Sequence, residues 1–281
     1  MPPEMPPSEG PMIRVQGLSK TYQTLTAVDN LSFDVYPGQI LGLIGRNGAG
    51  KTTTLRSLSG IIPASNGSIS LCGHDVAAEP IAAKRCLAMI PDDPSLFDLL
   101  TVWEHLEFIG ATYGLDHFES RAEELLELFE LSEKRDAVAQ ELSRGMRQKV
   151  SVCCALLHEP GVLFFDEPLT GLDPRAIRTL KDCIQKQALE QRAVIISSHL
   201  LSLVEDMCTD LLILERGVSR YCGPLDQLRE SFPEAGQEAS LESVFFFATE
   251  QDGAGQTSAV ATTTSPAIDS NTASDESGDQ P

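Results

Sequence analysis

A glycine-rich segment that could wrap phosphate groups lies between residues 45 and 53. Its sequence, Gly45-Arg46-Asn47-Gly48-Ala49-Gly50-Lys51-Thr52-Thr53, fits the pattern G-x-x-x-x-G-K-[ST]. Glycines allow successive backbone N–H groups to point toward an anion, Lys51 adds a mobile positive charge, and the Thr52 hydroxyl is placed to bind magnesium. The alternative is a glycine-rich turn without a ligand. However, an apolar run at 40–44 and a helix opening at 52–58 supply the strand and helix that a phosphate loop requires.

Two acidic residues at the end of another apolar run could take part in the same chemistry. Asp166 and Glu167 follow the run 162–165, which is typical of a buried strand. A carboxylate at a strand end can hold magnesium, directly or through water, and a second one can orient or deprotonate a water molecule that attacks a phosphate. The alternative is a buried strand that ends in two solvated acids. Beside a phosphate loop, we favour the catalytic interpretation.

Two further segments carry residue types that suit phosphate contacts. Ser143 is placed to cap a helix, and Gly145 would permit the close approach of a ligand to its first turn, although taken alone this is only a helix start. His199 follows an apolar run at 193–197. A single histidine is more often structural than catalytic, but one at a strand end beside a nucleotide can donate to the terminal phosphate.

These residues need a scaffold, and the hydrophobic pattern predicts an α/β fold. Near-continuous apolar strands that alternate with helices indicate a parallel sheet covered on both faces. Short strands near the N-terminus indicate an antiparallel sheet, and Thr101 with Glu104 forms a capping box at a helix start. Strands are expected at 13–15, 31–35, 40–44, 68–71, 161–166 and 193–197, with a hairpin around 216–217, and helices at 118–129 and from 143 onward.

Composition limits the classes of protein that remain. The formal net charge of the 281 residues is −20, which disfavours a nucleic-acid-coating role. The first residues lack the basic and apolar regions of a signal peptide, and no segment has the roughly 18 uninterrupted apolar residues of a membrane span. Seven cysteines without a C-x-x-C pattern favour reduced, mostly packed thiols over a disulfide framework.

The order of the motifs closely resembles that of the ATP-binding cassette (ABC) ATPases, over residues 12–248. It runs from an aromatic residue through the phosphate loop, a glutamine-loop position, a signature, the acidic strand and Gly171-Leu172-Asp173-Pro174 to a switch histidine. Within the family, the chain is most similar to ATP-binding subunits of exporters whose membrane domains are separate chains. That similarity rests on the segments 142–148, 90–92 and 241–245.

The resemblance implies a P-loop NTPase (RecA-like) core with an antiparallel β subdomain and an α-helical signature subdomain. We expect a proline-rich disordered N-terminus at 1–11, an ATPase domain at 12–248 with its helical subdomain at about 93–158, and an acidic disordered tail at 249–281.

The resemblance also implies ATP and Mg²⁺ as cofactors and assigns roles to individual residues. Tyr22 would stack on adenine, Glu167 would act as general base, and His199 would sense the γ-phosphate. Ser143 and Gly145 would contact a nucleotide held by a partner subunit. Nucleotide contacts fall on Tyr22, Val28, Gly45, Arg46, Asn47, Gly48, Ala49, Gly50, Lys51, Thr52, Thr53, Ser143, Gly145 and Asp173, catalysis on Glu167, His199 and Asp92, and magnesium on Thr52, Asp166 and Asp92.

Two departures from the family pattern bear on this assignment. Asp92 stands where the family has glutamine, and a carboxylate accepts from magnesium-bound water but adds negative charge beside the γ-phosphate. The signature has Arg144 and Met146 where the commoner form has glycine and glutamine. Arg144 would either add charge to the trans phosphate contact or be a solvated helix residue.

The leading hypothesis is an ATP-hydrolysing subunit, peripheral on the cytoplasmic face of a membrane, that powers transport through an integral membrane partner. The resemblance favours export. It also requires a second ATPase subunit, because one copy of each motif cannot close either site alone, and Asp173 would bridge the two halves of the head-to-tail dimer. Residues 94–100 are the expected contact with the membrane partner, with Phe97 exposed in a groove. The alternatives are a soluble ABC-type ATPase that regulates a non-transport process and a cassette whose nucleotide is only structural. No nucleic-acid partner is expected.

Overall fold

The computed structural model describes residues 10–233 and 240–250. Most of the expected N-terminal segment and of the acidic tail therefore lies outside the described residues. Thr249 and Glu250, which were expected in the tail, are instead part of the last described helix, α9 (Leu241–Glu250).

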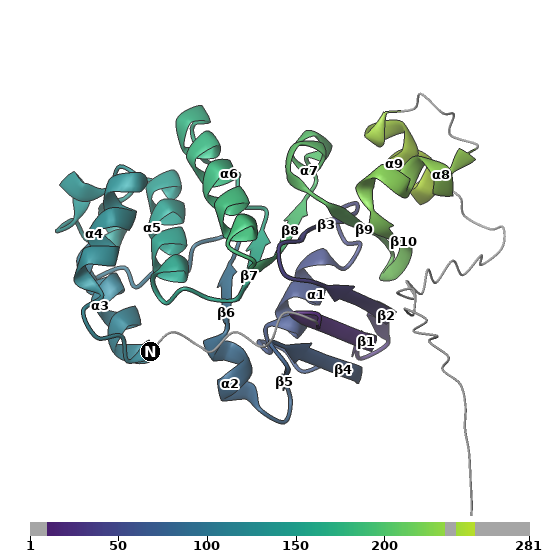
Figure 1. Cartoon of the computed structure of the whole chain (residues 1–281), viewed down its shortest axis with the longest axis horizontal. Coiled ribbons are helices and arrows are strands. Elements are labelled where there is room, and N and C mark those ends of the chain that lie inside the picture. Colours follow the sequence, from purple (N-terminus) through teal and green to yellow (C-terminus); the bar gives the residue numbers. More distant parts are fainter. Residues whose placement is uncertain (1–9, 234–239, 251–281) are drawn as a thin grey trace, which may run out of the picture.

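A six-stranded sheet forms the centre of the described chain, in the order β10-β9-β3-β8-β7-β6 (Figure 1). All neighbouring strands are parallel except the last hairpin, β9–β10. The predicted parallel sheet and hairpin are confirmed. The strands are β3 (Ile40–Ile44), β6 (Leu87–Ile90), β7 (Val162–Asp166), β8 (Ala193–Ser198), β9 (Asp210–Glu215) and β10 (Val218–Pro224).

Side chains alternate between two hydrophobic clusters along the central strands. In β7, Leu163 and Phe165 join one cluster, whereas Val162 and Phe164 join the other. Because successive side chains of a strand point to opposite faces, the uninterrupted apolar runs of the sequence show that both faces of this sheet are covered.

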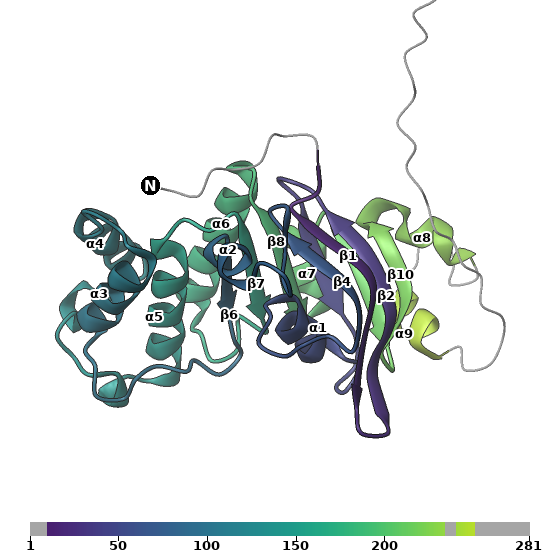
Figure 2. The ribbon, with the colours of Figure 1, turned by 90° about the horizontal axis from the view of Figure 1, so that it is seen from below.

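An antiparallel sheet and one helix cover one of these faces. The sheet has the order β2-β1-β4-β5, and α1 lies between it and the central sheet, with Leu55 and Leu58 in the shared cluster (Figures 1 and 2). These elements are β1 (Ile13–Tyr22), β2 (Leu25–Val35), β4 (Asn66–Leu71), β5 (His74–Asp75) and α1 (Lys51–Leu58).

Helices cover the other face and extend the molecule to one side. Figure 1 shows α6 and α7 over the central sheet, with α3, α4 and α5 grouped beyond β6 at one end. Thr101 Oγ1 accepts a hydrogen bond from Glu104 N at 3.1 Å, and Thr101 N donates to Glu104 Oε2 at 2.7 Å, so the predicted capping box is confirmed. The helices are α3 (Val102–Tyr113), α4 (Glu119–Leu128), α5 (Arg144–Leu157), α6 (Pro174–Leu189), α7 (Leu201–Met207) and α8 (Leu228–Ser231). No helix within 10–233 or 240–250 is long and apolar enough to cross a membrane.

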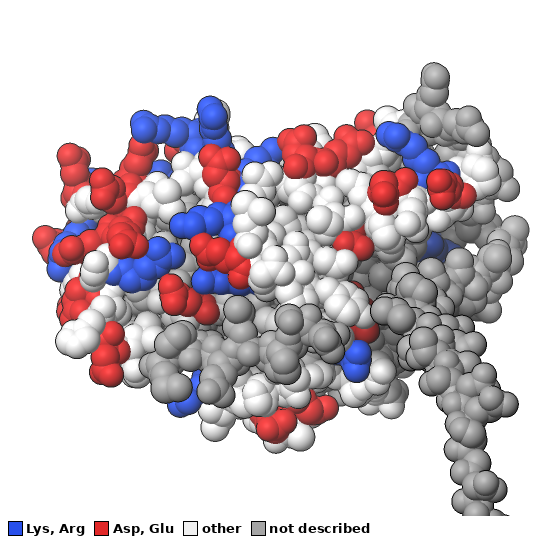
Figure 3. All heavy atoms as spheres, viewed as in Figure 1, with Lys and Arg blue, Asp and Glu red and all other residues white. Residues whose placement is uncertain are grey.

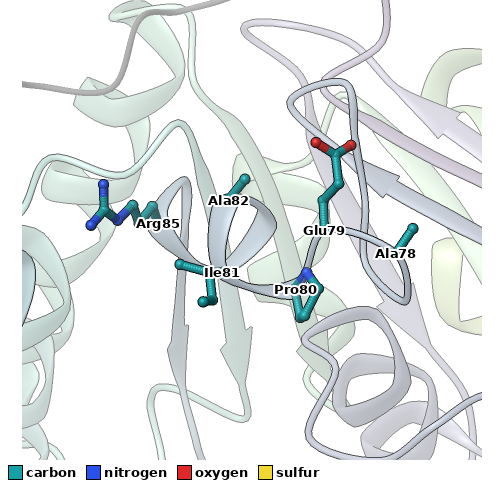
Figure 4. Close-up of a pocket in the computed structure, with 6 residues that line it drawn as sticks. All are labelled: Ala78, Glu79, Pro80, Ile81, Ala82 and Arg85. Carbon is teal, nitrogen blue, oxygen red and sulfur yellow. The ribbon is translucent and has the colours of Figure 1, made fainter.

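An open, shallow hollow is lined by α2 (Pro80–Arg85) and the residues just before it (Figure 4). The side chains of Glu79, Ile81 and Arg85 diverge from it and do not point toward a common centre. Such an arrangement offers no convergent polar groups for a ligand.

One disulfide contradicts the expectation of reduced cysteines. Cys72, just after β4, is bonded to Cys86, just before β6, while the other five cysteines are free. The two segments meet because both pass Gly161, where an added Cβ would lie 3.2 Å from Cys72 Sγ. The expectation of packed thiols holds for Cys153, whose burial raises its pKa well above the ordinary value.

A buried histidine at the end of α5 should make stability depend on pH. His158 stacks on Tyr113 with ring centroids 3.8 Å apart, and its Nδ1 has no partner. Burial lowers the pKa of His158 from 6.5 to about 4, so the folded state favours the neutral ring. The unfolded chain therefore binds the proton first, and stability is lost as the pH falls from 6.5 toward 4. When the pH is lowered from 7 to 5, this histidine should decrease the free energy of unfolding by about 2 kcal/mol.

The measurement is urea denaturation at a series of pH values, with His158→Phe as the comparison. The variant keeps the ring stack but cannot titrate, so its stability should fall less steeply below pH 6.5. Identical pH dependence in both proteins would contradict the prediction.

Candidate functional site

Four parallel strands end at the same edge of the central sheet and bring the predicted residues together. In spatial order β3, β8, β7 and β6, these ends lead into the phosphate loop, His199, the pair Asp166 and Glu167, and Asp92. Carboxyl ends of parallel strands are the usual ligand side of an open α/β sheet. The chemistry-bearing residues of the sequence therefore gather along one edge.

Close backbone contacts hold the phosphate loop in shape and leave no room for a side chain at Gly45 or Gly50. Gly50 has φ 109°, and a Cβ added there would lie 2.6 Å from the carbonyl oxygen of Ala27. A Cβ on Gly45 would lie 2.5 Å from the carbonyl oxygen of Leu214. The turn of the β9–β10 hairpin closes the assembly, because Gly217 N donates to Ala49 O at 2.9 Å. The glycines thus serve close backbone packing as well as a ligand.

Lys51 is buried beneath this loop. Its ammonium group donates to the Gly45 carbonyl at 2.8 Å and lies 3.9 Å from Glu167 Oε1. The side chains of Arg46 and Asn47, by contrast, are exposed at the rim. The lysine charge is therefore already placed between the loop and the acidic strand end.

The acidic strand end is organised by β8. Asp166 is buried and accepts a hydrogen bond of 2.5 Å from the Ser197 hydroxyl. Glu167 has a left-handed backbone with φ 49°, its N–H donates to Ser197 O at 3.1 Å, and its carboxylate lies 2.8 Å from His199 Nδ1. Strained backbone of this kind is often found at functional sites. Ser197 was not singled out as a site residue by sequence reasoning, because only the neighbouring strand reveals what it orients.

The oxygen groups near this edge fit magnesium better than a tightly caged metal. Among the described residues, no group of three or more His, Cys, Asp or Glu side chains could hold a metal ion. Mg²⁺ typically takes only one or two protein carboxylates together with phosphate oxygens and water. Asp166 and the exposed Thr52 hydroxyl suit that requirement. Asp92 is engaged elsewhere, since its Oδ1 lies 3.1 Å from Arg144 Nη2.

The signature residues start α5 as expected. The Ser143 hydroxyl accepts from Met146 N at 3.3 Å, and a Cβ on Gly145 would lie 2.7 Å from the carbonyl oxygen of Gly171. This glycine therefore allows α5 to pack against the loop after Glu167.

Asp173 caps α6 by accepting a hydrogen bond from Ala176 N at 2.9 Å, and that hydrogen bond is the main cause that lowers the pKa of the Asp173 carboxyl. Contacts of these residues with a second subunit stay a prediction.

The two residues assigned to the base end of a nucleotide lie on β1 and β2. Tyr22 is 44% exposed, with Lys20 Nζ 4.9 Å from its ring centroid. Val28 is fully buried, and its Cγ2 would lie 3.4 Å from a Cβ on Gly50. Tyr22 is thus partly exposed beside Lys20, while Val28 packs against the phosphate loop. Their nucleotide contacts also stay predictions.

Comparisons with known proteins agree with this geometry. A family profile described as "ABC transporter" matches residues 28–170. The ABC-type transporter ATP-binding protein EcsA of Bacillus subtilis is 36% identical over 243 residues, which is 86% of this chain and 98% of that protein. A Nod factor export ATP-binding protein I of Ralstonia nicotianae is 36% identical and aligns with 76% of this chain and 68% of its own length. A solved ATP-binding subunit of an ABC transporter superimposes with a TM-score of 0.80 at 35% identity, covering 84% of this chain and 99% of that one.

Proposed function

Since the chain belongs to the ABC transporter family, we propose that it is the ATP-binding and ATP-hydrolysing subunit of a transporter and that it drives export through separate membrane-spanning chains. The predicted family and the P-loop NTPase fold are confirmed by the comparisons. The observation that carries the function is the contact network at the strand ends. In this network the Glu167 carboxylate lies 3.9 Å from Lys51 Nζ and 2.8 Å from His199 Nδ1, although the three residues are far apart in the sequence.

Each member of this network has a role in ATP hydrolysis. The loop amides and Lys51 would bind the phosphates, and Glu167 would accept a proton from the attacking water. His199 would hold the Glu167 carboxylate in position and contact the γ-phosphate. Magnesium, when bound with the nucleotide, neutralises charge on the β- and γ-phosphates. Thr52 and Asp166 are the residues that would hold it.

The proposal includes a second ATPase subunit. Ser143 and Gly145 start α5, which belongs to the group of helices beyond β6, whereas the phosphate loop leads into α1 (Figure 1). With one copy of each motif, a complete site requires the signature of another chain. The resemblance supports a head-to-tail dimer, formed by identical or different ATPase subunits.

A soluble ABC-type regulator is the weaker candidate. On the face shown in Figure 3, the described Lys and Arg side chains are interspersed with Asp and Glu, and they do not form one continuous basic patch. A nucleic-acid partner would favour such a patch. The names of EcsA and of the Nod factor export protein instead point to transport.

Phosphate release by the purified full chain tests the proposal directly. We expect ATP hydrolysis that depends on Mg²⁺ and is abolished by EDTA. A chain that binds ATP but shows no hydrolysis, alone or with its membrane partner, would instead support the structural-nucleotide alternative.

Phe97 is the residue through which we expect the membrane partner to bind. It is 55% exposed, meets Phe108 edge to face at 5.4 Å, and its backbone N–H donates to His105 Nε2 at 3.0 Å. Leu99 beside it is 78% exposed, whereas Leu96 packs against the core. An ordered aromatic residue of this kind suits a helix-in-groove contact with an aromatic anchor.

Phe97→Asp should leave the subunit folded and able to bind ATP but release it from membranes that contain its partner. The measurement is the fraction of subunit in the membrane pellet. Ile81→Asp is a matched control, because Ile81 is also an exposed apolar residue and lies on α2. A subunit with this substitution should stay membrane-bound. Transport and membrane association that survive Phe97→Asp would place the docking surface elsewhere.

A further inference from the structure

The first turn of α5 reaches back to the loop that follows β6. Arg144 Nη2 lies 3.1 Å from Asp92 Oδ1 and 3.4 Å from the Asp92 carbonyl oxygen. The carbon chain of the same arginine lies along Gly171, where an added Cβ would meet Arg144 Cδ at 3.3 Å. Arg144 is thus ordered by contacts with two separate loops and does not simply extend into solvent.

Asp92 lies at the edge of the sheet where its negative charge would act on bound phosphates. In the parallel pairing of β6 with β7, Ile90 lies opposite Phe165. Asp92 lies two residues after Ile90, and Glu167 lies two residues after Phe165. The two acids therefore follow the ends of neighbouring strands at corresponding positions. With Asp166, they would place three carboxylates at the edge that receives the phosphates of ATP. A third uncompensated negative charge there would repel the nucleotide.

We propose that Arg144 is a positioning residue that neutralises Asp92 and holds its carboxylate away from the phosphates bound to the same chain. On this view the two departures from the family pattern, the acid at 92 and the arginine at 144, compensate each other. The inference rests on the proposed function, because it concerns the bound nucleotide. It differs from a contact of Arg144 with a phosphate held by the partner, which would not depend on Asp92.

A double-mutant cycle separates these two roles. The full chain, Arg144→Gln, Asp92→Asn and the double variant would be titrated with a fluorescent, non-hydrolysable ATP analogue and with the ADP counterpart. Both side chains are about half exposed, so solvent screens the interaction. We expect Arg144→Gln to weaken ATP binding about fivefold, which corresponds to about 1 kcal/mol. The affinity for the ADP counterpart, which lacks the terminal phosphate, should fall by less than twofold.

The decisive result is rescue. Arg144→Gln should lower ATP affinity about fivefold when Asp92 is present, but by less than twofold when it is added to Asp92→Asn. Arg147→Gln is the matched control, because the Arg147–Asp98 ion pair of 3.0 Å joins the same helix to the same loop but leaves Asp92 neutralised. It should not alter ATP affinity, and thermal denaturation should show all variants folded.

Several outcomes would overturn the proposal. A loss that persists in the double variant would mean that Arg144 acts on a phosphate itself. Equal weakening of ATP and ADP binding would indicate a structural disturbance. If Arg144→Gln bound ATP as tightly as the wild type, Asp92 would need no neutralisation. If the wild-type chain bound neither analogue, the proposed function would fail and not this inference.

Discussion

Replacement of Glu167 by glutamine is expected to lower the rate of ATP hydrolysis by about 10²–10⁴-fold, the usual cost of losing a positioned general base. The amide keeps the shape of the side chain but cannot accept the proton of the attacking water. ATP binding should survive, because Lys51 keeps its 2.8 Å contact with the Gly45 carbonyl and the phosphate loop is unchanged. The variant should therefore accumulate as an ATP-bound dimer, visible by size-exclusion chromatography with ATP.

Glu159 supplies a matched control for this substitution. It is an exposed glutamate two residues after α5 with φ 52°, so Glu159→Gln makes the same chemical change on a similar left-handed backbone. Its hydrolysis rate should equal that of the wild type. If Glu167→Gln turned over ATP at a near wild-type rate, Glu167 would not be the base.

Replacement of Gly50 by alanine should destabilise the protein by about 3 kcal/mol even without nucleotide. The backbone at φ 109° costs an alanine about 1–3 kcal/mol, and overpacking against the Ala27 carbonyl at 2.6 Å adds a comparable amount. Any relaxation must move either β2 or the phosphate loop. ATP binding should therefore be lost together with stability, as urea denaturation and nucleotide titration would show.

The variant Gly48→Ala separates the cost of the backbone conformation from the cost of overpacking. Gly48 also has a positive φ, 81°, but an added Cβ there would meet nothing within 4 Å. This variant should lose only about 1 kcal/mol, the cost of a left-handed alanine. Equal losses in the two variants would mean that backbone conformation alone, and not the packing of the loop against β2, sets the glycine requirement.

The elements that the sequence predicted are those whose cause is local. The apolar run 162–165 predicted a strand buried on both faces, because every position of it contacts one cluster or the other. Thr101 and Glu104 predicted a helix start because a capping box needs only residues three apart. The phosphate loop was likewise predictable, since its strand, glycines and helix are consecutive.

What the sequence did not predict depends on distant contacts. Arg144 and Asp92 are 52 residues apart, so their pairing appears only once α5 packs beside the loop after β6. Cys72 and Cys86 follow no recognised spacing, and their bond depends on both segments passing Gly161. The left-handed backbone of Glu167 also has no sequence signal, because glycine usually takes that conformation.

The pairing of β3 has a consequence for the synthesis of the protein. This strand leads into the phosphate loop, yet its two neighbours in the sheet are β8 and β9, which begin at Ala193 and Asp210. During translation, the edges of β3 therefore stay unpaired until more than half of the chain has emerged. Contacts of such long sequence separation fold slowly and leave apolar strand edges open to aggregation. Nascent chains that end before β8 should consequently need chaperone protection and should not retain nucleotide.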